Sequence, residues 1–510
     1  MAKSLINHLV KNYLKWRYSR IEAMRSRPIE LQSKILEQLL SNGVHTEWGR
    51  KHHFNHIKNR DDFRKAMPLQ VYEDLQPYIQ RMMHGEESVL WPGKTSWYAK
   101  SSGTSSNQSK FIPVTKQKLK QAHVTSGWDA LSIYYHHNPE AKMFSERSLL
   151  IAGSIEAYDH HPESRYGDVS AIMVHHMPWV GRPFYSPNYK FLLQPDWELK
   201  IEHIVENCID HRVTAIIGVP TWVVSIFNAI LEKTGQSNIH EVWPELQVYM
   251  HGGVGFDPYR DMFQRYLPKP MDYLEGYNAS EGYFAMQDDL NQPGLLLLTN
   301  NGVYYEFLPL EELGKDEPQT IDLQDVELGK CYAMVISTVS GLWRYMPGDT
   351  VCFISTAPYR IKVTGRTSQF MNAFGEELIV SNADQAIALA AHHHEATVTE
   401  YTVAPIYMDN RKKGGHEWLI EFGEEPESIK DFSHTLDRYL QAVNTDYQAK
   451  RHKSIALGLP HIHNLPKGTF FNWMKHHGKL GAQHKIPRLS NDRKIVNQIL
   501  SFTSESKIYA

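Results

Sequence analysis

The chain has few cysteines and no long apolar stretch. Its three cysteines, Cys208, Cys331 and Cys352, show no CxxC pairing and are too few for a disulfide framework, which indicates a reducing compartment. The longest apolar run, VVSIFNAIL, is about half of the roughly 20 residues that a bilayer-spanning helix needs. An apolar signal-peptide core followed by a cleavage site is also missing. These absences predict a cytoplasmic protein without membrane insertion.

An excess of either charge is missing as well, because 54 lysines and arginines face 57 aspartates and glutamates. This balance gives no general attraction to nucleic acid. The 28 histidines are many, but the adjacent pairs lack carboxylates or cysteines at metal-ligand spacing, so no structural zinc site is expected. The basic, amphipathic N-terminal segment allows two interpretations, a helix packed on the domain, which we prefer, or a membrane-surface anchor.

The length of 510 residues exceeds what one hydrophobic core usually supports, so at least two domains are expected. Between residues 148 and 282, apolar strands alternate with helical segments, which predicts a mostly parallel, doubly wound sheet. From about Leu295, close-set strands with Gly and Asn turns indicate an antiparallel or β-barrel-like part. We therefore predict an α/β protein with a large domain over residues 1–378 and a small C-terminal α+β domain over residues 379–510.

A loop rich in hydroxyl groups, SSGTSSNQSK, runs from Ser101 to Lys110. Phosphate binding needs backbone N–H groups that can point at oxygens, nearby hydroxyl donors and often a cation, and this loop offers all three. The pattern GxxxxGK[ST] is absent, which excludes the common P-loop of kinases and GTPases. A plain Ser/Thr-rich turn is an equally good account of this stretch taken alone.

Two further segments place a carboxylate beside glycine. In GYNASEG, Glu281 follows a predicted strand and could hold magnesium together with phosphate oxygens, or could be a solvated turn residue. In GLWRYMPGDTV, Asp349 opens a strand after Pro-Gly and could accept the paired hydroxyls of a ribose, or could simply cap a turn. The sequence also contains TGR at the suspected domain junction and KIPR near the C-terminus.

The order SSGTS…K, GYxxSEG, GLWRYxPGD, TGR and KIPR resembles the adenylate-forming (acyl-AMP) enzymes. More closely, the chain is similar to the auxin-responsive (Gretchen Hagen) family of acyl acid amido synthetases. Segments such as TEWGRKHHF, VYYEFLPLEE and VELGKCYAMVISTVSGLWRYMPGD also look like family segments. The resemblance extends from about residue 46 to about residue 490.

The resemblance implies a ligase that uses ATP and magnesium to convert a small carboxylic acid to an acyl-adenylate, and then transfers the acyl group to an amino acid amine. Lys485 and Glu281 would be catalytic, with Glu281 as the magnesium ligand. The implied ATP-binding residues are Ser101, Ser102, Gly103, Thr104, Ser105, Lys110, Gly252, Gly253, Tyr277, Ser280, Asp349 and Arg366. The small domain would rotate between the two half-reactions.

Several points stay open at this stage. The implied acid-binding residues Val219, Trp222 and Phe227 could equally be the core side of a buried helix. The chain has Ser106-Asn107 where many plant members carry further glycine, so the phosphate contacts of the loop are not fixed. An acyl-CoA ligase with the same first step, or a non-catalytic nucleotide- or carboxylate-binding protein, are the alternative functions. The acid, the amino acid and the oligomeric state are not determined by the sequence.

Overall fold

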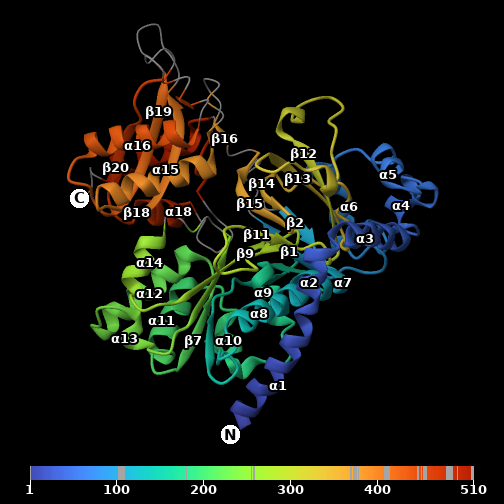
Figure 1. The fold of residues 1–510 in the computed structure, drawn as a ribbon, viewed down its shortest axis with the longest axis horizontal. Helices are drawn as coiled ribbons and strands as arrows, with labels where there is room; N and C mark the ends of the chain where they lie inside the picture. The colour runs from blue at the N-terminus through green and yellow to red at the C-terminus, as the bar shows by residue number, and fades with distance from the viewer. Residues whose placement is uncertain are drawn as a thin grey trace. The chain divides into compact units, whose positions relative to one another are not determined.

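The fold is described from a computed structural model (Figure 1). It describes residues 2–101, 110–179, 181–253, 256, 259–367, 370–371, 376, 378–406, 414–444, 447–448, 451, 457–477, 486–490 and 492–506. The chain divides into two compact units, one of residues 1–254 and 266–363 and one of residues 255–265 and 364–510. We describe each unit by itself, and the boundary expected between residues 378 and 379 stays a prediction.

The larger unit is built on an 11-stranded sheet with the order β12-β13-β14-β15-β11-β10-β9-β8-β7-β3-β6. The neighbouring pairs from β9 through β8, β7 and β3 to β6 are parallel. The pairs β9-β10, β10-β11, β11-β15, β12-β13 and β13-β14 are antiparallel. The strands are β3 (Arg147–Leu150), β6 (Tyr185–Ser186), β7 (Val213–Ile217), β8 (Val248–Gly252), β9 (Asp272–Asn278), β10 (Tyr283–Met286), β11 (Leu295–Leu297), β12 (Val303–Pro309), β13 (Cys331–Thr338), β14 (Asp349–Thr356) and β15 (Tyr359–Arg366). The predicted α/β class is confirmed, and the antiparallel part continues the parallel sheet.

A smaller sheet with the order β2-β1-β5-β4 accompanies the large one. Its strands are β1 (Trp97–Ser101), β2 (Lys110–Pro113), β4 (Ile155–Ala157) and β5 (Arg165–Gly167). β1 and β2 are antiparallel, and Ser101 lies directly opposite Lys110. This hairpin therefore holds both ends of the hydroxyl-rich loop.

Capping residues, proline and glycine mark the ends of two helices of the larger unit. α11 begins after Asp196, whose carboxylate accepts the N–H of Leu199 at 3.1 Å, as expected of an N-terminal cap. α12 has a proline in its first turn and ends at Gly235 in the left-handed region (φ 67°). The helices are α1 (Ala2–Arg17), α2 (Ser19–Ser26), α3 (Pro28–Gly43), α4 (Glu47–Lys51), α5 (Arg60–Ala66), α6 (Tyr72–Met83), α7 (Lys116–Lys118), α8 (Thr125–His137), α9 (Val169–His175), α10 (Tyr189–Leu192), α11 (Trp197–Asn207), α12 (Pro220–Thr234) and α13 (Ile239–Val242).

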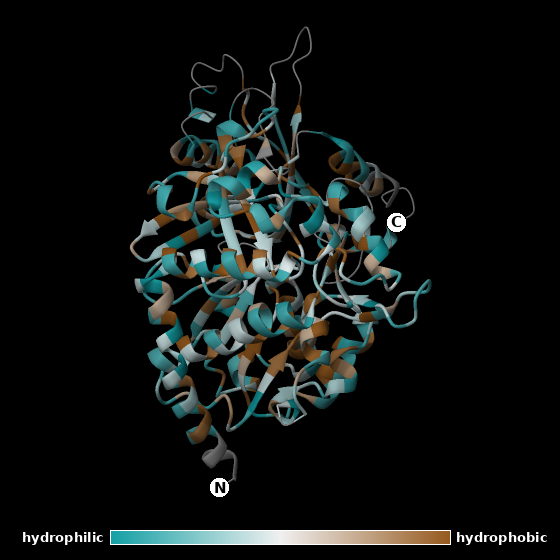
Figure 2. Cartoon of the chain, turned by 90° about the vertical axis from the view of Figure 1, so that its right-hand side faces the viewer, coloured by the Kyte–Doolittle hydropathy of each residue, from teal (hydrophilic) through white to brown (hydrophobic). Residues whose placement is uncertain are grey.

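The N-terminal helix α1 packs against α8. The hydroxyl of Ser132 donates to the carbonyl of Leu14 at 2.6 Å, and Arg17 forms an ion pair with Asp129 at 2.7 Å. Figure 2 shows hydrophobic and hydrophilic segments alternating along the helix beside the N-terminus. These contacts agree with the interpretation of a helix packed on the domain. None of the helices described combines the length and apolar character needed to cross a bilayer.

The smaller unit contains a three-stranded sheet with helices on both of its faces. β18 (Thr397–Ile406) pairs antiparallel with β19 (Gly415–Glu424), which pairs parallel with β20 (His461–Leu465). Side chains alternate along β19, so Trp418 and Ile420 join one apolar cluster and Leu419 joins another. The helices are α14 (Arg260–Tyr266), α15 (Val380–His393), α16 (Ile429–Val443), α18 (Thr469–His476) and α19 (Lys494–Ser506). The last residue of α14, Tyr266, belongs to the larger unit. The expected small α+β domain matches this architecture.

Two of the three cysteines are paired. Cys331 and Cys352 lie directly opposite each other on β13 and β14 and form a disulfide, with 4.0 Å between their Cα atoms. Cys208 is free and buried. This pair was not expected from the sequence, because the strand register, not a short motif, brings the two cysteines together. The inference of a reducing compartment therefore loses the support of these two cysteines.

Candidate functional site

The candidate site begins at the carboxyl ends of the parallel strands β8 and β9, where ligands bind in sheets of this kind. Gly252 pairs with Gly276, and a Cβ atom on Gly252 would lie 2.2 Å from the carbonyl oxygen of Gly276. Only glycine permits this approach of the two strands. Gly253 follows in the left-handed region (φ 83°), so the chain turns sharply as it leaves the sheet. The predicted pair of glycines thus shapes the backbone at this edge.

The ribose candidate Asp349 is brought to the same strand end by a tyrosine. The hydroxyl of Tyr277, on β9, donates to Oδ2 of Asp349 at 2.5 Å. Asp349 opens β14 after Gly348, which has a positive φ of 89°. The hydrogen bond joins two of the predicted ATP-binding residues and fixes the orientation of the carboxylate.

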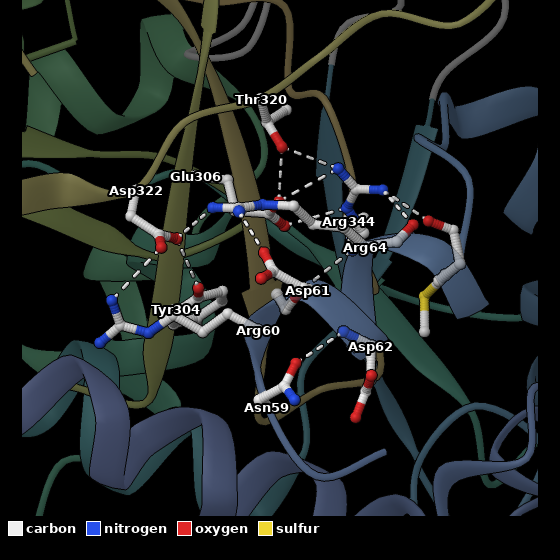
Figure 3. Close-up of polar contacts among 12 residues, drawn as sticks. Asn59, Arg60, Asp61, Asp62, Arg64, Tyr304, Glu306, Thr320, Asp322 and Arg344 are labelled. Atoms are coloured by element: carbon white, nitrogen blue, oxygen red, sulfur yellow. Dashed lines mark hydrogen bonds and ion pairs between the residues drawn. The ribbon is translucent and has the colours of Figure 1, made fainter. Parts of the chain in front are cut away.

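The loop that leads to Asp349 is held by a buried arginine. Arg344 has a positive φ of 42° and is 5% exposed. Its guanidinium donates to both carboxylate oxygens of Glu306, at 3.0 and 3.1 Å, and to the hydroxyl of Thr320 at 2.8 Å (Figure 3). The carbonyl of Met67 accepts a further hydrogen bond at 2.5 Å. Arg344, the arginine of GLWRYMPGD, therefore stabilises the loop.

Further contacts extend this network. Arg64 on α5 lies 3.4 Å from Glu306 and 2.5 Å from Asp322, and Tyr304 donates to Asp322 at 3.0 Å (Figure 3). The neighbouring Trp343 is fully buried and donates its ring N–H to the carbonyl of Leu90. Buried charges are costly unless they are paired and hydrogen-bonded, and here Arg344 and Glu306 pair through two hydrogen bonds. These contacts therefore fix the start of the loop that leads to Asp349.

The magnesium candidate Glu281 lies in a tight turn between β9 and β10. Ser280 and Glu281 are 7% and 6% exposed, so Glu281 is not the solvated turn residue that the sequence allowed. The buried ammonium group of Lys118 donates to the carbonyl of Ser280 at 2.7 Å and to that of Pro113 at 3.1 Å. Burial lowers the pKa of Lys118 to about 7, against the opposing effect of the negative charge on Glu281.

Lys118 connects two parts of the predicted site. Pro113 ends β2, the strand that returns from the hydroxyl-rich loop, and Ser280 precedes the magnesium candidate. A neutral amine still carries two N–H bonds, and the two carbonyls accept them. Lys118 can thus hold β2 against the Ser280-Glu281 turn in either protonation state.

Lys118 and His123 were not predicted from the sequence. His123 is fully buried, and burial lowers its pKa to about 3, with a further decrease from the charge of Lys118. It is therefore neutral at physiological pH. Both residues belong to the stretch KQKLKQAH, which has the composition of an exposed helix. Its position, separated from the hydroxyl-rich loop by residues 111–115, is the one signal that could have drawn attention to them.

The remaining predicted residues are placed as follows. Lys110 lies half-buried with its ammonium group 5.5 Å from the centre of the Tyr72 ring. Arg366 is the last residue of β15. Ser102, Gly103, Thr104, Ser105 and Lys485 lie outside the described residues, so their roles stay predictions.

The acid-binding candidates are on and before α12. Val219 precedes the helix, and Trp222 packs on Trp197 with 4.1 Å between ring centres. Phe227 is fully buried and packs on Tyr266 with 5.4 Å between ring centres. These are core-packing contacts. The role of the three residues in binding an acid stays a prediction.

Three family domains match the chain in order. The GH3 family N-terminal domain matches residues 17–271, the central domain matches residues 296–366 and the C-terminal domain matches residues 381–494. Among curated proteins, the chain is 23% identical to the indole-3-acetic acid-amido synthetase GH3.3 of Arabidopsis thaliana, over 92% of this chain and 90% of that protein. It is 25% identical to GH3.8 of Oryza sativa subsp. indica, over 92% and 89%.

Solved structures give the same fold. The GH3.15 acyl acid amido synthetase in complex with 2,4-DB superposes with a TM-score of 0.79 at 18% identity, over 96% of both chains. A 2-hydroxyisobutyryl-CoA ligase in the postadenylation state superposes with a TM-score of 0.58 at 12% identity, over 94% of this chain and 92% of that one. The fold is thus that of the amido synthetases and, more distantly, of an acyl-CoA ligase.

Proposed function

Because the chain belongs to the GH3 family, we propose that it is an ATP-dependent acyl acid amido synthetase. The enzyme joins a small carboxylic acid to an amino acid through an acyl-adenylate. The observation that carries this proposal is the ordered match to the N-terminal, central and C-terminal domains of the family. The burial of Glu281 and the hydrogen bond from Tyr277 to Asp349 support it, because acidic groups near strand ends suit the binding of magnesium and a ribose.

The first half-reaction brings two anions together, the carboxylate of the acid and the α-phosphate of ATP. Positive charge and oriented N–H donors must offset their repulsion. Residues 101–105 and Lys110 hold the β- and γ-phosphates, and Lys485 approaches the reacting carboxylate. Asp349, oriented by Tyr277, accepts the ribose hydroxyls, and Arg366 assists there.

The residues around Glu281 fit a magnesium ion. The carboxylate is buried, next to the hydroxyl of Ser280, and oxygen ligands suit this ion. Magnesium at this position supplies charge neutralisation for the phosphates. Burial lowers the pKa of Lys118 to about 7, so this lysine can lose its charge when a cation binds at Glu281.

The second half-reaction transfers the acyl group to the amine of an amino acid, and AMP leaves with one carboxyl oxygen. Rotation of the C-terminal domain, residues 379–510, removes Lys485 from the site and admits the amine. The acid lies against α12, near Val219, Trp222 and Phe227, and the enzyme acts in the cytoplasm.

One incubation tests this function. The protein is mixed with ATP, magnesium, a panel of carboxylic acids and either amino acids or coenzyme A, and the products are identified by mass spectrometry. AMP together with an amide supports the proposal. AMP with a thioester contradicts it in favour of an acyl-CoA ligase, the function of the more distant fold neighbour. Binding of ATP and acid without any AMP indicates a non-catalytic binding protein.

A further inference from the structure

Two histidines and a glutamate converge on the sheet of the smaller unit. His461 and His463 are two residues apart on β20, so their side chains lie on the same face. On the parallel neighbour β19, Glu417 lies directly opposite His461. Its Oε1 is 2.7 Å from Nε2 of His463 and 3.7 Å from Nδ1 of His461. These three ligand atoms all lie within 4.8 Å of one another.

Hydrogen bonds orient the carboxylate of Glu417 and keep it ionised. Its second oxygen, Oε2, accepts a hydrogen bond from the guanidinium of Arg493, which also donates to the carbonyl of Pro405 at 2.8 Å. Burial alone would raise the pKa of Glu417, but the hydrogen bonds from Arg493 and His463 outweigh it and keep the pKa below its usual value. The side chain is therefore an ionised carboxylate in a fixed orientation.

We propose that Nδ1 of His461, Nε2 of His463 and Oε1 of Glu417 form a binding site for a divalent transition-metal ion, with zinc as the expected ion. Zinc–nitrogen and zinc–oxygen bonds of about 2.0–2.1 Å in a tetrahedron separate the ligand atoms by about 3.4 Å. The separations of 2.7 and 3.7 Å lie on either side of this value, and the ligand atoms all lie within 4.8 Å of one another, so rotations of the side chains are needed to reach the tetrahedral geometry.

The chemistry of the ligands also determines the kind of ion. Imidazole nitrogen suits zinc and its first-row neighbours, whereas magnesium prefers oxygen ligands alone. Because Arg493 occupies Oε2, Glu417 offers one oxygen, and the three protein ligands leave a fourth position for water. The side chain of His461 is 60% exposed, which gives the ion a path from solvent. The site is thus distinct in chemistry from the magnesium candidate at Glu281.

No structural zinc site was expected from the sequence, because the adjacent histidine pairs lack ligands at metal-binding spacing. The pair on β20 is separated by one residue, and its carboxylate comes from another strand. The signal HxH in a short strand is present at residues 461–463, but the parallel register with β19 is needed to supply Glu417.

Zinc binding by the full-length protein tests the proposal. The protein is treated with a chelator, freed of it, and titrated with zinc in competition with a chromophoric chelator. The comparison uses His461→Gln, which changes an exposed side chain, and the control His392→Gln, which changes an exposed histidine of α15 in the same unit. Circular dichroism confirms that each variant is folded, and the readout does not depend on ligase activity.

We expect the wild type and His392→Gln to bind one zinc ion with the same affinity. His461→Gln should bind zinc more weakly by over 100-fold, because loss of a direct ligand costs more than the roughly 10- to 100-fold that loss of an outer hydrogen-bond partner costs. His463→Gln should show a similar loss. An excess of magnesium should leave the zinc in place. Equal zinc affinity of the wild type and His461→Gln, or displacement of the zinc by magnesium, would overturn the proposal.

Discussion

Replacing Lys118 by methionine tests whether this buried lysine, which joins Pro113 to Ser280, titrates near neutral pH. Methionine keeps the length and apolar stem of the side chain and removes the group that titrates. Lys116 lies on the same short helix, α7, and is exposed, so Lys116→Met is a matched control. The variants are compared with the wild type by their free energy of unfolding as a function of pH.

The expected size follows from the pKa of Lys118, which burial lowers from 10.5 to about 7. The difference, 10.5 − 7, is about 3.5, and a difference of one in pKa corresponds to about 1.4 kcal/mol, so the net effect of burial and the opposing charge of Glu281 disfavours the charged form by about 5 kcal/mol. Between these two pKa values the unfolded chain binds more protons than the folded chain. The free energy of unfolding of the wild type therefore rises with pH across this window.

The measurement is urea unfolding followed by circular dichroism from about pH 6 to about pH 9.5. Relative to Lys118→Met, the wild type should gain about 1.4 kcal/mol for each pH step above 7 and nothing below it. Lys116→Met should follow the wild type in parallel. A constant difference between wild type and Lys118→Met from pH 7 to pH 9.5 would show that Lys118 does not titrate in this range, and the reasoning would be refuted.

Three other variants test the site. Arg344→Met leaves Glu306 buried without its main partner and should lower the free energy of unfolding by about 3–5 kcal/mol, as urea unfolding would show; an unchanged midpoint would contradict this. Asp349→Asn weakens charge-assisted hydrogen bonds worth about 1.5–3 kcal/mol, so the KM for ATP should rise roughly 10- to 100-fold in steady-state assays, and an unaltered KM would exclude the ribose role. Gly252→Ala places a Cβ atom 2.2 Å from the carbonyl of Gly276 and should lower the melting temperature in calorimetry, unlike Gly127→Ala on α8, whose Cβ has open space.

Much of the fold was predictable because local patterns decide it. The apolar strands expected between residues 148 and 282 include β7 and β8, and Asp196 caps α11, one of the helices between the strands. The placement of Gly252 and Glu281 at strand ends follows from the same pattern, since carboxyl ends of parallel strands share one edge. Short-range sequence signals were sufficient for these features.

The features that the sequence did not indicate depend on register or on burial. Cys331 and Cys352 meet through the pairing of β13 with β14. Lys118 has the sequence context of an exposed lysine, and only the packing of its helix beneath the Ser280 turn buries it. Long-range contacts of this kind carry no local signature, so the sequence alone could not identify them.

The central claim is that an acyl-adenylate precedes the amide, and an isotope transfer tests it most directly. The acid that gives a product in the panel assay is labelled with a heavy oxygen isotope in its carboxyl group and converted with ATP, magnesium and the amino acid. If the carboxylate attacks the α-phosphate, the amine displaces AMP and one labelled oxygen remains on its phosphate. Labelled AMP and unlabelled pyrophosphate are the expected products. ADP with labelled inorganic phosphate would indicate an acyl-phosphate route and contradict it.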